Sequence, residues 1–499
     1  MVRQTDTTTH EPLAPQIEAR IQHLIRAYGV SANAFQILEP GYRYFFEGSP
    51  SDAESVIAYV ETSRWWVVAG GPIGPLEDVA RAFQGFVAQA HAQKKSVILM
   101  GVEPTLLKAL EPVLQAYSVI KIGEQPEWNV QDYSIDGSLR RTVRTQVNRA
   151  RNKGVQVRRV DHSELVRAPG VLRLQIQYIM DKWLASRRVA PLRFMVNLEP
   201  FLYPEERRYY VAEKGTETVG FLAAVPVYGR KGWFFEDVIR VPDAPNGTGE
   251  SLIHHAMVDV RDHGEDYATL GLSPLSGIQK GTGDDRVLRW GLRQASKRLE
   301  AVYGFDGLRR FKARFKPDRW VPQYAIMPQK ASRISAVWAI VCAFAPDSIV
   351  RFVYESFRRI VSRVNGRVWS CLLALQLAIL LPWTALLSVA DGAAWFGDSS
   401  IKWAWVVFNS ILSVCLLGLT RLLWLHHPAA RRVSMFLAGA TMTDGVVSTV
   451  QAIQLHTEVS GWAFVFVVLG VVGPYLATFF LWCIAIATPA YSPRRSERQ

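Results

Sequence analysis

The chain has 499 residues, more than one hydrophobic core normally serves, so two or more folding units are expected. A formal net charge of +13 fits a protein that meets phosphate, in nucleic acid or in anionic lipid headgroups, and charge alone does not choose between them. All the cysteines (Cys342, Cys371, Cys415 and Cys483) fall in or near the apolar C-terminal third, which excludes a disulfide framework or a cysteine-based metal site in the residues before them.

The first two thirds of the chain alternate strand-like apolar runs with stretches of helical periodicity. Strands are predicted at SVIAYVE, RWWVVAGG and KSVILMG, with helices near 76–93 and 104–117. A second round follows at RYYVAEKG, VGFLAAVPVYG, GWFFEDVIRV and YATLGLSPL, with a helix near 249–263. The pattern predicts an α/β fold of two similar units in tandem, 12–165 and 166–330.

A strongly basic helix is predicted over 139–153, with almost no compensating acid. Arg140, Arg144 and Arg151 fall roughly along one stripe of this helix, which suits the backbone of an RNA or an anionic membrane surface. The alternative is a structural helix that only joins the two units.

The stretch FFEDVIRVPDAPNGTGESLI is typical of a strand, a Pro/Gly-rich turn and a helix. Exposed N–H groups at such a helix start can hold a phosphate or an oxyanion, which makes Gly247 and Gly249 candidate substrate-binding residues. The alternative is that the two glycines only make the turn. Asp237 and Arg240 are three apart on the preceding strand, so a bulge or the strand end must intervene for both to reach one pocket.

LGLSPLSGI ends a strand with small and hydroxylic residues, where Ser273 and Ser276 are candidates for hydrogen bonds to a substrate. No Gly-x-Ser-x-Gly motif is present and no histidine is indicated as a partner, which argues against a covalent acyl-serine. Serines that close a turn are the alternative. No His-Glu-x-x-His or similar spacing occurs, so no metal site is predicted.

The stretch YGFDGLRRFKARFKPDRW concentrates cations and interleaves them with aromatic residues. Phe311 and Phe315 are i and i+4, so they are expected to anchor one helical face and leave the cations on the others. Lys312 or Arg310 is then a candidate to stabilise an oxyanion or to bind a phosphate of lipid or RNA. A solvated basic face is the usual alternative.

The last part of the chain is mostly apolar, with four segments long enough to cross a bilayer: 368–390, 403–424, 433–454 and 461–488. The third carries Thr441, Asp444 and Ser448, so it is expected inside the bundle. The preceding 331–367 is predicted to be an interfacial amphipathic linker, with a fifth, distorted span or a buried packing element as alternatives. Because the Arg-rich loops fall on one side, residues 1–366 and the C-terminal tail are expected in the cytoplasm, at the inner membrane.

Several passages resemble, in content and in order, the aminoacyl-transferring domain of the phosphatidylglycerol lysyltransferases, the multiple peptide resistance factor family: VVAGGPIGP, GSLRRTVRTQVNRARNKG, FFEDVIRVPDAPNGTGESLI, LGLSPLSGI and YGFDGLRRFKARFKPDRWVPQY. The resemblance spans roughly residues 35–327. It implies tandem acetyltransferase-like (GNAT-like) folds that move an amino acid, lysine or similar, from aminoacyl-tRNA to a lipid such as phosphatidylglycerol. Aminoacyl-tRNA would be a co-substrate, and no cofactor is implied. The family usually places its membrane helices before this domain, whereas here they follow it.

The resemblance also implies roles for individual residues. Its active-site segments match Asp237, Arg240, Arg310 and Lys312 as catalytic residues, and Tyr303, Asp306 and Arg309 as substrate-binding residues. Asp237 would hold the donor's α-ammonium or take a proton from the acceptor hydroxyl.

Transfer of an aminoacyl group between hydroxyls exchanges one ester for another, so it needs positioning and charge stabilisation rather than ATP, and no GxxxxGK[ST] motif is present. Two other functions stay open. The first is an acyl-CoA-dependent GNAT-like N-acyltransferase, although Ala244 stands where such enzymes normally carry Arg or Gln. The second is a non-catalytic membrane protein that binds lipid or RNA.

Overall fold

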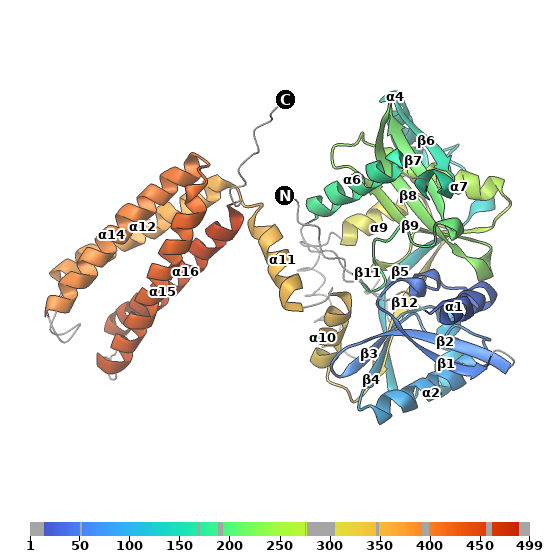
Figure 1. Ribbon diagram of the computed structural model, residues 1–499, viewed down its shortest axis with the longest axis horizontal. Coiled ribbons are helices and arrows are strands. Elements are labelled where there is room, and N and C mark those ends of the chain that lie inside the picture. Colours follow the sequence, from blue (N-terminus) through green and yellow to red (C-terminus); the bar gives the residue numbers. More distant parts are fainter. Residues whose placement is uncertain are drawn as a thin grey trace. The chain divides into compact units, whose positions relative to one another are not determined.

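The computed structural model describes residues 14–49, 52–166, 170–187, 193–274, 276, 305–345, 349–391, 399–455 and 462–488 (Figure 1). The chain divides into two compact units, one that ends at Phe352 and one that begins at Val353. The first unit holds a mixed α/β sheet and the second a bundle of long apolar helices. Both parts of the predicted fold class are confirmed.

In the first unit, the described strands form one 12-stranded sheet in the order β1-β2-β3-β4-β12-β5-β10-β9-β8-β7-β6, with β11 paired to β5. The pairs β3/β4 and β9/β10 are parallel, and the other pairs are antiparallel. The strands are β1 Arg43–Ser49, β2 Asp52–Glu61, β3 Trp65–Ala69, β4 Ser96–Val102, β5 Tyr117–Asn129, β6 Val155–Val160, β7 Arg208–Lys214, β8 Glu217–Val227, β9 Gly232–Arg240, β10 Tyr267–Thr269, β11 Ser273–Pro274 and β12 Arg319–Pro328.

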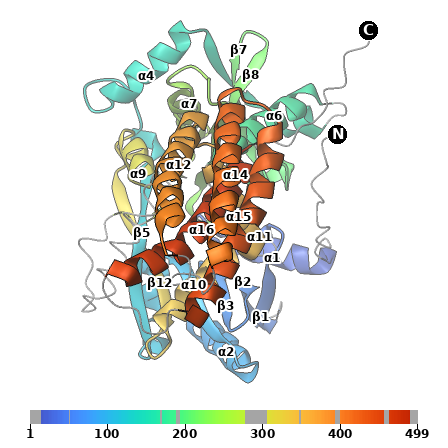
Figure 2. The same ribbon diagram turned by 90° about the vertical axis from the view of Figure 1, so that its left-hand side faces the viewer.

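Strand β12 is the last described strand in the chain, yet it lies in the interior of the sheet. It lies between β4 and β5, with Ala325 opposite Met100 on one side and Ile120 on the other. The paired strands β12 and β5 run side by side in Figure 2. Strand β5 in turn pairs with β10. Neither β5 nor β12 is among the strands that the sequence pattern predicts. Each lies inside the sheet although it contains a proline (Pro126 and Pro322), a residue usually confined to edge strands.

Helices pack on both faces of the sheet (Figure 1). The buried residues of α2 include Val79, Phe83, Phe86 and Ala90, whose helical spacing places them on one face against the strands. The helices of this unit are α1 Pro15–Tyr28, η1 Phe35–Leu38, α2 Val79–Ala92, α3 Pro104–Leu110, η2 Glu111–Val113, η3 Val130–Asp132, α4 Arg141–Asn152, α5 His162–Val166, α6 Val171–Ser186, η4 Pro204–Glu206, η5 Tyr228–Arg230, α7 Thr248–Asp262, α9 Phe305–Ala313 and α10 Arg333–Phe344.

One predicted helix is shorter than the sequence pattern indicates. The expected helix over 104–117 ends at Leu110, and Pro112 lies in the 3-10 turn that follows. Proline cannot donate a backbone hydrogen bond inside a helix, so the chain turns there and Tyr117 begins β5.

The segment predicted as an interfacial linker, 331–367, contains two helices. Helix α10 packs on the sheet through Ala336, Ala339 and Ala343, and the indole nitrogen of Trp65 donates to the Ser335 hydroxyl at 2.9 Å. Its opposite face is apolar and exposed, with Ile334 at 84% and Trp338 at 55%. Helix α11, Ile349–Val361, joins the second unit, where Phe357 stacks on Trp482.

The second unit is built from α12 Gly366–Val389, α14 Ser399–Trp424, α15 Ala429–Leu455 and α16 Trp462–Ala487. These four described helices are long and apolar enough to cross a membrane, as expected of a multi-pass membrane protein. The polar third span is shielded in part: Thr441 and Asp444 are buried, whereas Thr443 is exposed. Hydroxyl contacts between Thr441 and Thr478 (2.8 Å) and between Thr449 and Tyr475 (3.1 Å) join α15 to α16.

Candidate functional site

The joint between β9 and α7 is shaped by Gly247. This residue caps the helix with φ +95°, a conformation that favours glycine, and a Cβ atom there would lie 2.0 Å from the carbonyl oxygen of Gln146 in α4. The close contact brings α4 against the start of α7. Gly249 follows in the first turn of the helix, where backbone N–H groups lack partners within the helix.

A pocket of about 560 Å³ opens at this joint, and we call it the arginine pocket. Its charged lining residues are four arginines from separate elements and one acid: Arg149 of α4, Arg187 after α6, Arg240 of β9, Arg314 after α9, and Glu250 of α7. Gly247 and Gly249 also line it. The excess of positive charge and the helix start both favour an anion in this pocket.

Three of the four arginines of the pocket contact neighbouring groups. Arg314 forms an ion pair with Glu250 at 3.2 Å, and the Arg187 guanidinium lies 3.9 Å over the Trp183 ring. Arg240 donates weakly to the carbonyl of Val241 at 3.3 Å. Desolvation in the pocket and the neighbouring charge of Arg240 lower the pKa of Arg187. A bound phosphate would relieve the repulsion between these two guanidinium groups.

The structure does not bring Asp237 into the arginine pocket beside Arg240. Strand β9 has a bulge at Glu236, with Phe235 opposite Ala224 and Asp237 opposite Ala223. The bulge lies before Asp237 and the register from Asp237 to Arg240 is regular, so the two side chains point to opposite faces and do not reach one pocket. Asp237 instead lies in a buried acidic cluster, which consists of Glu39, Glu236 and Asp237 around Arg207.

Among the residues that the structure describes, Glu236 is the one member of the acidic cluster with a direct ion pair. Arg207, fully buried in its side chain, donates to Glu236 at 2.5 Å, and Gln36 donates to the same carboxylate at 2.8 Å. Both carboxyl oxygens of Glu39 and one of Asp237 have no hydrogen-bond partner among the described residues. Burial, and then repulsion from Glu236, raise the pKa of Glu39 and of Asp237 well above the ordinary carboxyl range.

We expect Glu39→Gln to raise the melting temperature at pH 8 and to leave it unchanged near pH 4. The folded-state pKa of Glu39 lies above the unfolded value of about 4.3, so as the pH rises the unfolded chain loses its proton first and folding stability falls. Glutamine does not titrate, so the difference from wild type should grow with pH. Thermal unfolding of the full chain across this range measures it.

Glu61→Gln is the control of opposite sign. A hydrogen bond from Lys95 lowers the pKa of Glu61, so its stabilising contribution is present above about pH 4 and is lost as the pH falls through the folded-state pKa. Glu61→Gln should therefore lower the melting temperature at pH 8. A Glu39→Gln variant that is also less stable at pH 8 would show that the Glu39 carboxyl is ionised and paired.

Helix α9 holds Lys312 in a buried position. Phe315 after the helix is fully buried and packs edge-to-face on Phe311 at 5.6 Å, which confirms the expected apolar face. The Lys312 ammonium donates to the carbonyls of Gly271 and Leu272, each at 2.9 Å, and burial lowers its pKa to about 7. Lys312 is thus an oriented, desolvated amine and no part of a solvated face.

The other candidates of this region differ in their surroundings. Ser276 is buried and donates to the carbonyl of Ser273, while the hydroxyl of Ser273 has no partner among the described residues. Arg309 donates to Glu124 at 3.0 Å and lies over the Trp320 ring, and Arg310 is exposed. Tyr303 lies outside the described residues, and of Asp306 only its place in α9 is described.

The predicted basic stripe is only partly formed. Arg140 precedes α4 and is buried, with its guanidinium bonded to the carbonyls of Phe315, Ser134 and Lys316, so it fixes the chain rather than facing a phosphate. Arg144 donates to the carbonyls of Ile135 and Gly137. Arg151 is exposed. The structural role left open for this helix therefore holds for Arg140.

Sequence reasoning missed Arg187 and Trp183 of the pocket, and Glu39 and Arg207 of the acidic cluster. No motif surrounds them, and each reaches its place through contacts between distant segments; Gln36 and Glu236, for example, are 200 residues apart. The run KWLASRR, with its paired arginines beside a tryptophan, is the one local signal for the pocket.

Residues 23–327 match the family model described as "Phosphatidylglycerol lysyltransferase, C-terminal". A phosphatidylglycerol lysyltransferase of Bacillus subtilis is 24% identical over 286 residues, which are 56% of this chain and 32% of that protein. A lysylphosphatidylglycerol biosynthesis bifunctional protein of Nocardia farcinica is 25% identical over 312 residues, 60% of this chain and 26% of that protein. The chain thus spans about a third or less of the length of these relatives.

Two solved structures share the fold. The C-terminal domain (DUF2156) of a lysylphosphatidylglycerol synthetase from Agrobacterium fabrum aligns with a TM-score of 0.55 at 23% identity, covering 65% of this chain and 95% of that one. L-PGS from Bacillus licheniformis aligns with a TM-score of 0.55 at 19% identity, covering 68% of this chain and 98% of that one.

Proposed function

The chain belongs to the phosphatidylglycerol lysyltransferase family through that family's C-terminal domain, and we propose that it transfers an amino acid, lysine or similar, from aminoacyl-tRNA to a membrane lipid such as phosphatidylglycerol. The acceptor hydroxyl attacks the ester carbonyl, a new ester forms, and the tRNA ribose hydroxyl leaves with a proton. One ester replaces another, so no further co-reactant is needed.

The arginine pocket is the observation that carries this proposal. Both substrates contain phosphodiesters: the donor carries one next to its terminal adenosine, and the acceptor lipid carries one in its head. Four guanidinium groups and the start of α7 supply the charge that such a group needs. A guanidinium group can donate two parallel hydrogen bonds to a phosphate. Such contacts would hold the substrate tightly and also orient its reacting ester.

Lys312 and the acidic cluster support separate roles in the transfer. The Lys312 ammonium, oriented by two carbonyls, is suited to stabilise the oxyanion of the tetrahedral intermediate. The acidic cluster has unpartnered carboxyl oxygens that suit an α-ammonium group. A raised pKa does not favour Asp237 as a general base at neutral pH, because its carboxyl keeps a proton until a cation arrives.

We place the first unit in the cytoplasm, at the inner membrane. Charged tRNA exists there, and the Arg-rich loops before α12 and between α14 and α15 follow the positive-inside pattern. The four apolar helices keep the enzyme beside its lipid.

The test is a donor assay with the purified full chain in mixed micelles of phosphatidylglycerol. Radiolabelled lysyl-tRNA should yield a labelled lipid, and RNase treatment of the donor should abolish the label. Arg240→Ala should weaken the reaction at least tenfold, since it removes a charge-assisted phosphate contact. Arg261→Ala is a matched control, because that arginine pairs with Asp262 away from the pocket.

An acyl-CoA-dependent N-acyltransferase is the second candidate, since the pyrophosphate of CoA would also suit the start of α7 and the arginine pocket. The same assay contains an arm with acetyl-CoA and an amine acceptor. Product that forms with acetyl-CoA and survives RNase would replace the aminoacyl-transfer proposal. Lipid or RNA binding without product in any arm would favour the non-catalytic alternative.

A further inference from the structure

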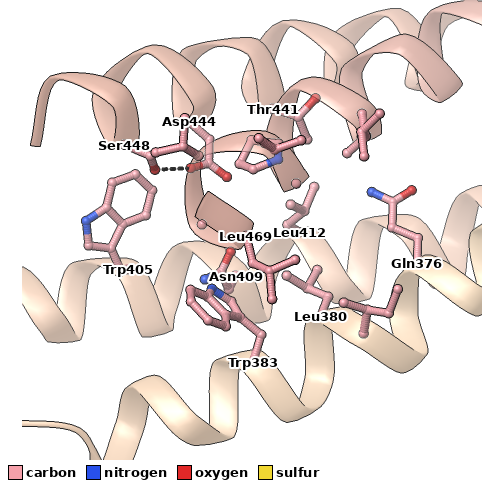
Figure 3. Close-up of a pocket in the computed structure, with 18 of the residues that line it drawn as sticks. Gln376, Leu380, Trp383, Trp405, Asn409, Leu412, Thr441, Asp444, Ser448 and Leu469 are labelled. Atoms are coloured by element: carbon pink, nitrogen blue, oxygen red, sulfur yellow. Dashed lines mark hydrogen bonds between the residues drawn. The ribbon is translucent and has the colours of Figure 1, made fainter. Parts of the chain in front are cut away.

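The bundle of the second unit contains a cavity of about 570 Å³ that the proposed transfer does not use (Figure 3). The cavity opens to the surface of the bundle, where the lining residues Ile379 and Leu469 are exposed. Residues of α12, α14, α15 and α16 all line it. Most of the lining is apolar, with Leu380, Leu412 and Leu469 among the side chains that face the space. A volume of this size accommodates a small headgroup together with part of an acyl chain.

The cavity contains an acid without a matching cation. Asp444 of α15 is 9% exposed, and one of its carboxylate oxygens accepts a hydrogen bond from the Ser448 hydroxyl at 3.0 Å. Among the described residues no other donor reaches this carboxylate, and no lysine, arginine or histidine lines the cavity. A carboxylate at this depth is costly, so such residues usually face a ligand or a proton path.

Two further acceptors border the same space. Asn409 of α14 is 4% exposed, and in the described part of the chain its side chain has no hydrogen bond. Pro474 of α16 has no N–H group, so the carbonyl of Gly470, one turn earlier and also in the lining, lacks its usual helical donor. Unsatisfied acceptors are tolerated inside a bilayer only where they line a cavity.

Two tryptophan side chains line the cavity together with Asp444 and Asn409. These are Trp383 of α12 and Trp405 of α14. In Figure 3, Trp383 lies across the space from Asp444, and Trp405 lies on the side of Ser448. The indole nitrogen of Trp405 donates to the Gln451 side chain at 3.2 Å, which fixes its ring. Tryptophan faces attract cations, most strongly away from water.

We propose that this cavity binds the primary ammonium headgroup of a membrane lipid. An ammonium carries one positive charge and three N–H donors, which the Asp444 carboxylate, the Asn409 amide oxygen and the Gly470 carbonyl can accept, while its chains follow the leucine-lined wall. Two lipids share this chemistry: one with an ethanolamine head, and an aminoacylated lipid, whose presence rests on the proposed function.

Native mass spectrometry of the full chain in detergent tests the site. The protein is titrated with short-chain phosphatidylethanolamine, its N-acetylated form, phosphatidylglycerol and lysyl-phosphatidylglycerol. Asp444→Asn, which keeps the shape of the side chain, should weaken binding of the ammonium lipids tenfold or more, because it removes a charge-assisted hydrogen bond. Thr443→Val is the matched control, since Thr443 is the preceding residue and is exposed.

Each outcome decides the proposal. The site is supported if one or both ammonium lipids bind and the N-acetylated lipid does not. Which of the two ammonium lipids binds then identifies the ligand. Equal binding of the N-acetylated lipid, or undiminished affinity in a folded Asp444→Asn variant, overturns it. Because the readout is binding, a chain that fails the donor assay can still pass this one.

Discussion

Replacing Lys312 by methionine is expected to lower the turnover of aminoacyl transfer by about 100-fold or more, the scale found when one preorganised charge-stabilising donor is removed. The Lys312 ammonium is buried and oriented by the carbonyls of Gly271 and Leu272, so one of its three N–H groups is left for a substrate oxygen. Methionine keeps the length and packing of the stem. Steady-state assays at saturating donor and lipid measure the loss.

Stability must be measured alongside turnover, because Lys312→Met also leaves two buried carbonyls without a donor, at a cost of roughly 1–3 kcal/mol each. Lys316→Met is the control: this lysine is exposed, just past the end of α9, and should change neither quantity. A lower melting temperature with unchanged turnover per folded molecule would leave Lys312 a purely structural residue.

The pH profile supplies a readout that a structural role would not move. Burial lowers the pKa of Lys312 to about 7, so a reaction that needs its charged form should slow as the pH rises through 7. Lys312→Arg keeps the charge and should abolish that limb. The effect of Lys312 on folding stability has the opposite dependence on pH. The unfolded chain takes up the Lys312 proton at about pH 10.4 and the folded chain only near 7, so folding stability falls as the pH drops from about 10.4 to 7.

Gly247→Ala is expected to destabilise the first unit by roughly 2–4 kcal/mol, through a left-handed backbone and a clash. The residue has φ +95°, and the new Cβ atom would lie 2.0 Å from the Gln146 carbonyl oxygen. That oxygen belongs to the backbone of α4, so relief requires α4 and α7 to separate. The arginine pocket, which Arg149 and Gly247 both line, would open with them. Chemical denaturation measures the change.

Gly249→Ala is the matched control two residues further on. A Cβ atom there finds only Phe311, at 3.8 Å, and the position is helical, so the substitution should stabilise α7 by about 0.5–1 kcal/mol. The added methyl group would still narrow the mouth of the arginine pocket. If Gly249→Ala weakens substrate binding without lowering stability, the substrate binds at this mouth. Equal, small stability changes from both alanines would contradict the close contact between α4 and α7.

Features that depend on local pattern can be predicted from the amino-acid sequence. Alternating apolar runs predicted β2, β3, β4 and the strands around Asp237, and four long apolar segments predicted the membrane helices. The strand-turn-helix joint at Gly247 was equally local, because the turn residues and the helical period lie in one stretch. The spacing of Phe311 and Phe315 predicted the buried face near Lys312 for the same reason.

Which of these residues come into contact depends on the packing of segments that are far apart in the chain. Strand β12 enters the sheet between β4 and β5, a pairing that no local period encodes. Asp237 and Arg240 are three residues apart in the regular part of β9, beyond the bulge at Glu236, so their side chains point to opposite faces of the sheet. Contacts with other segments then decide their partners: Asp237 lies with Glu236 and Arg207, and Arg240 lines the pocket with Arg187. The sequence places Arg140 on an exposed basic stripe, but in the folded protein its guanidinium is buried and donates to the carbonyls of Phe315 and Lys316, just after α9. Burial and charge partners are set by segments far apart in the chain, so the pKa values and the pocket that follow from them are properties of the folded protein alone.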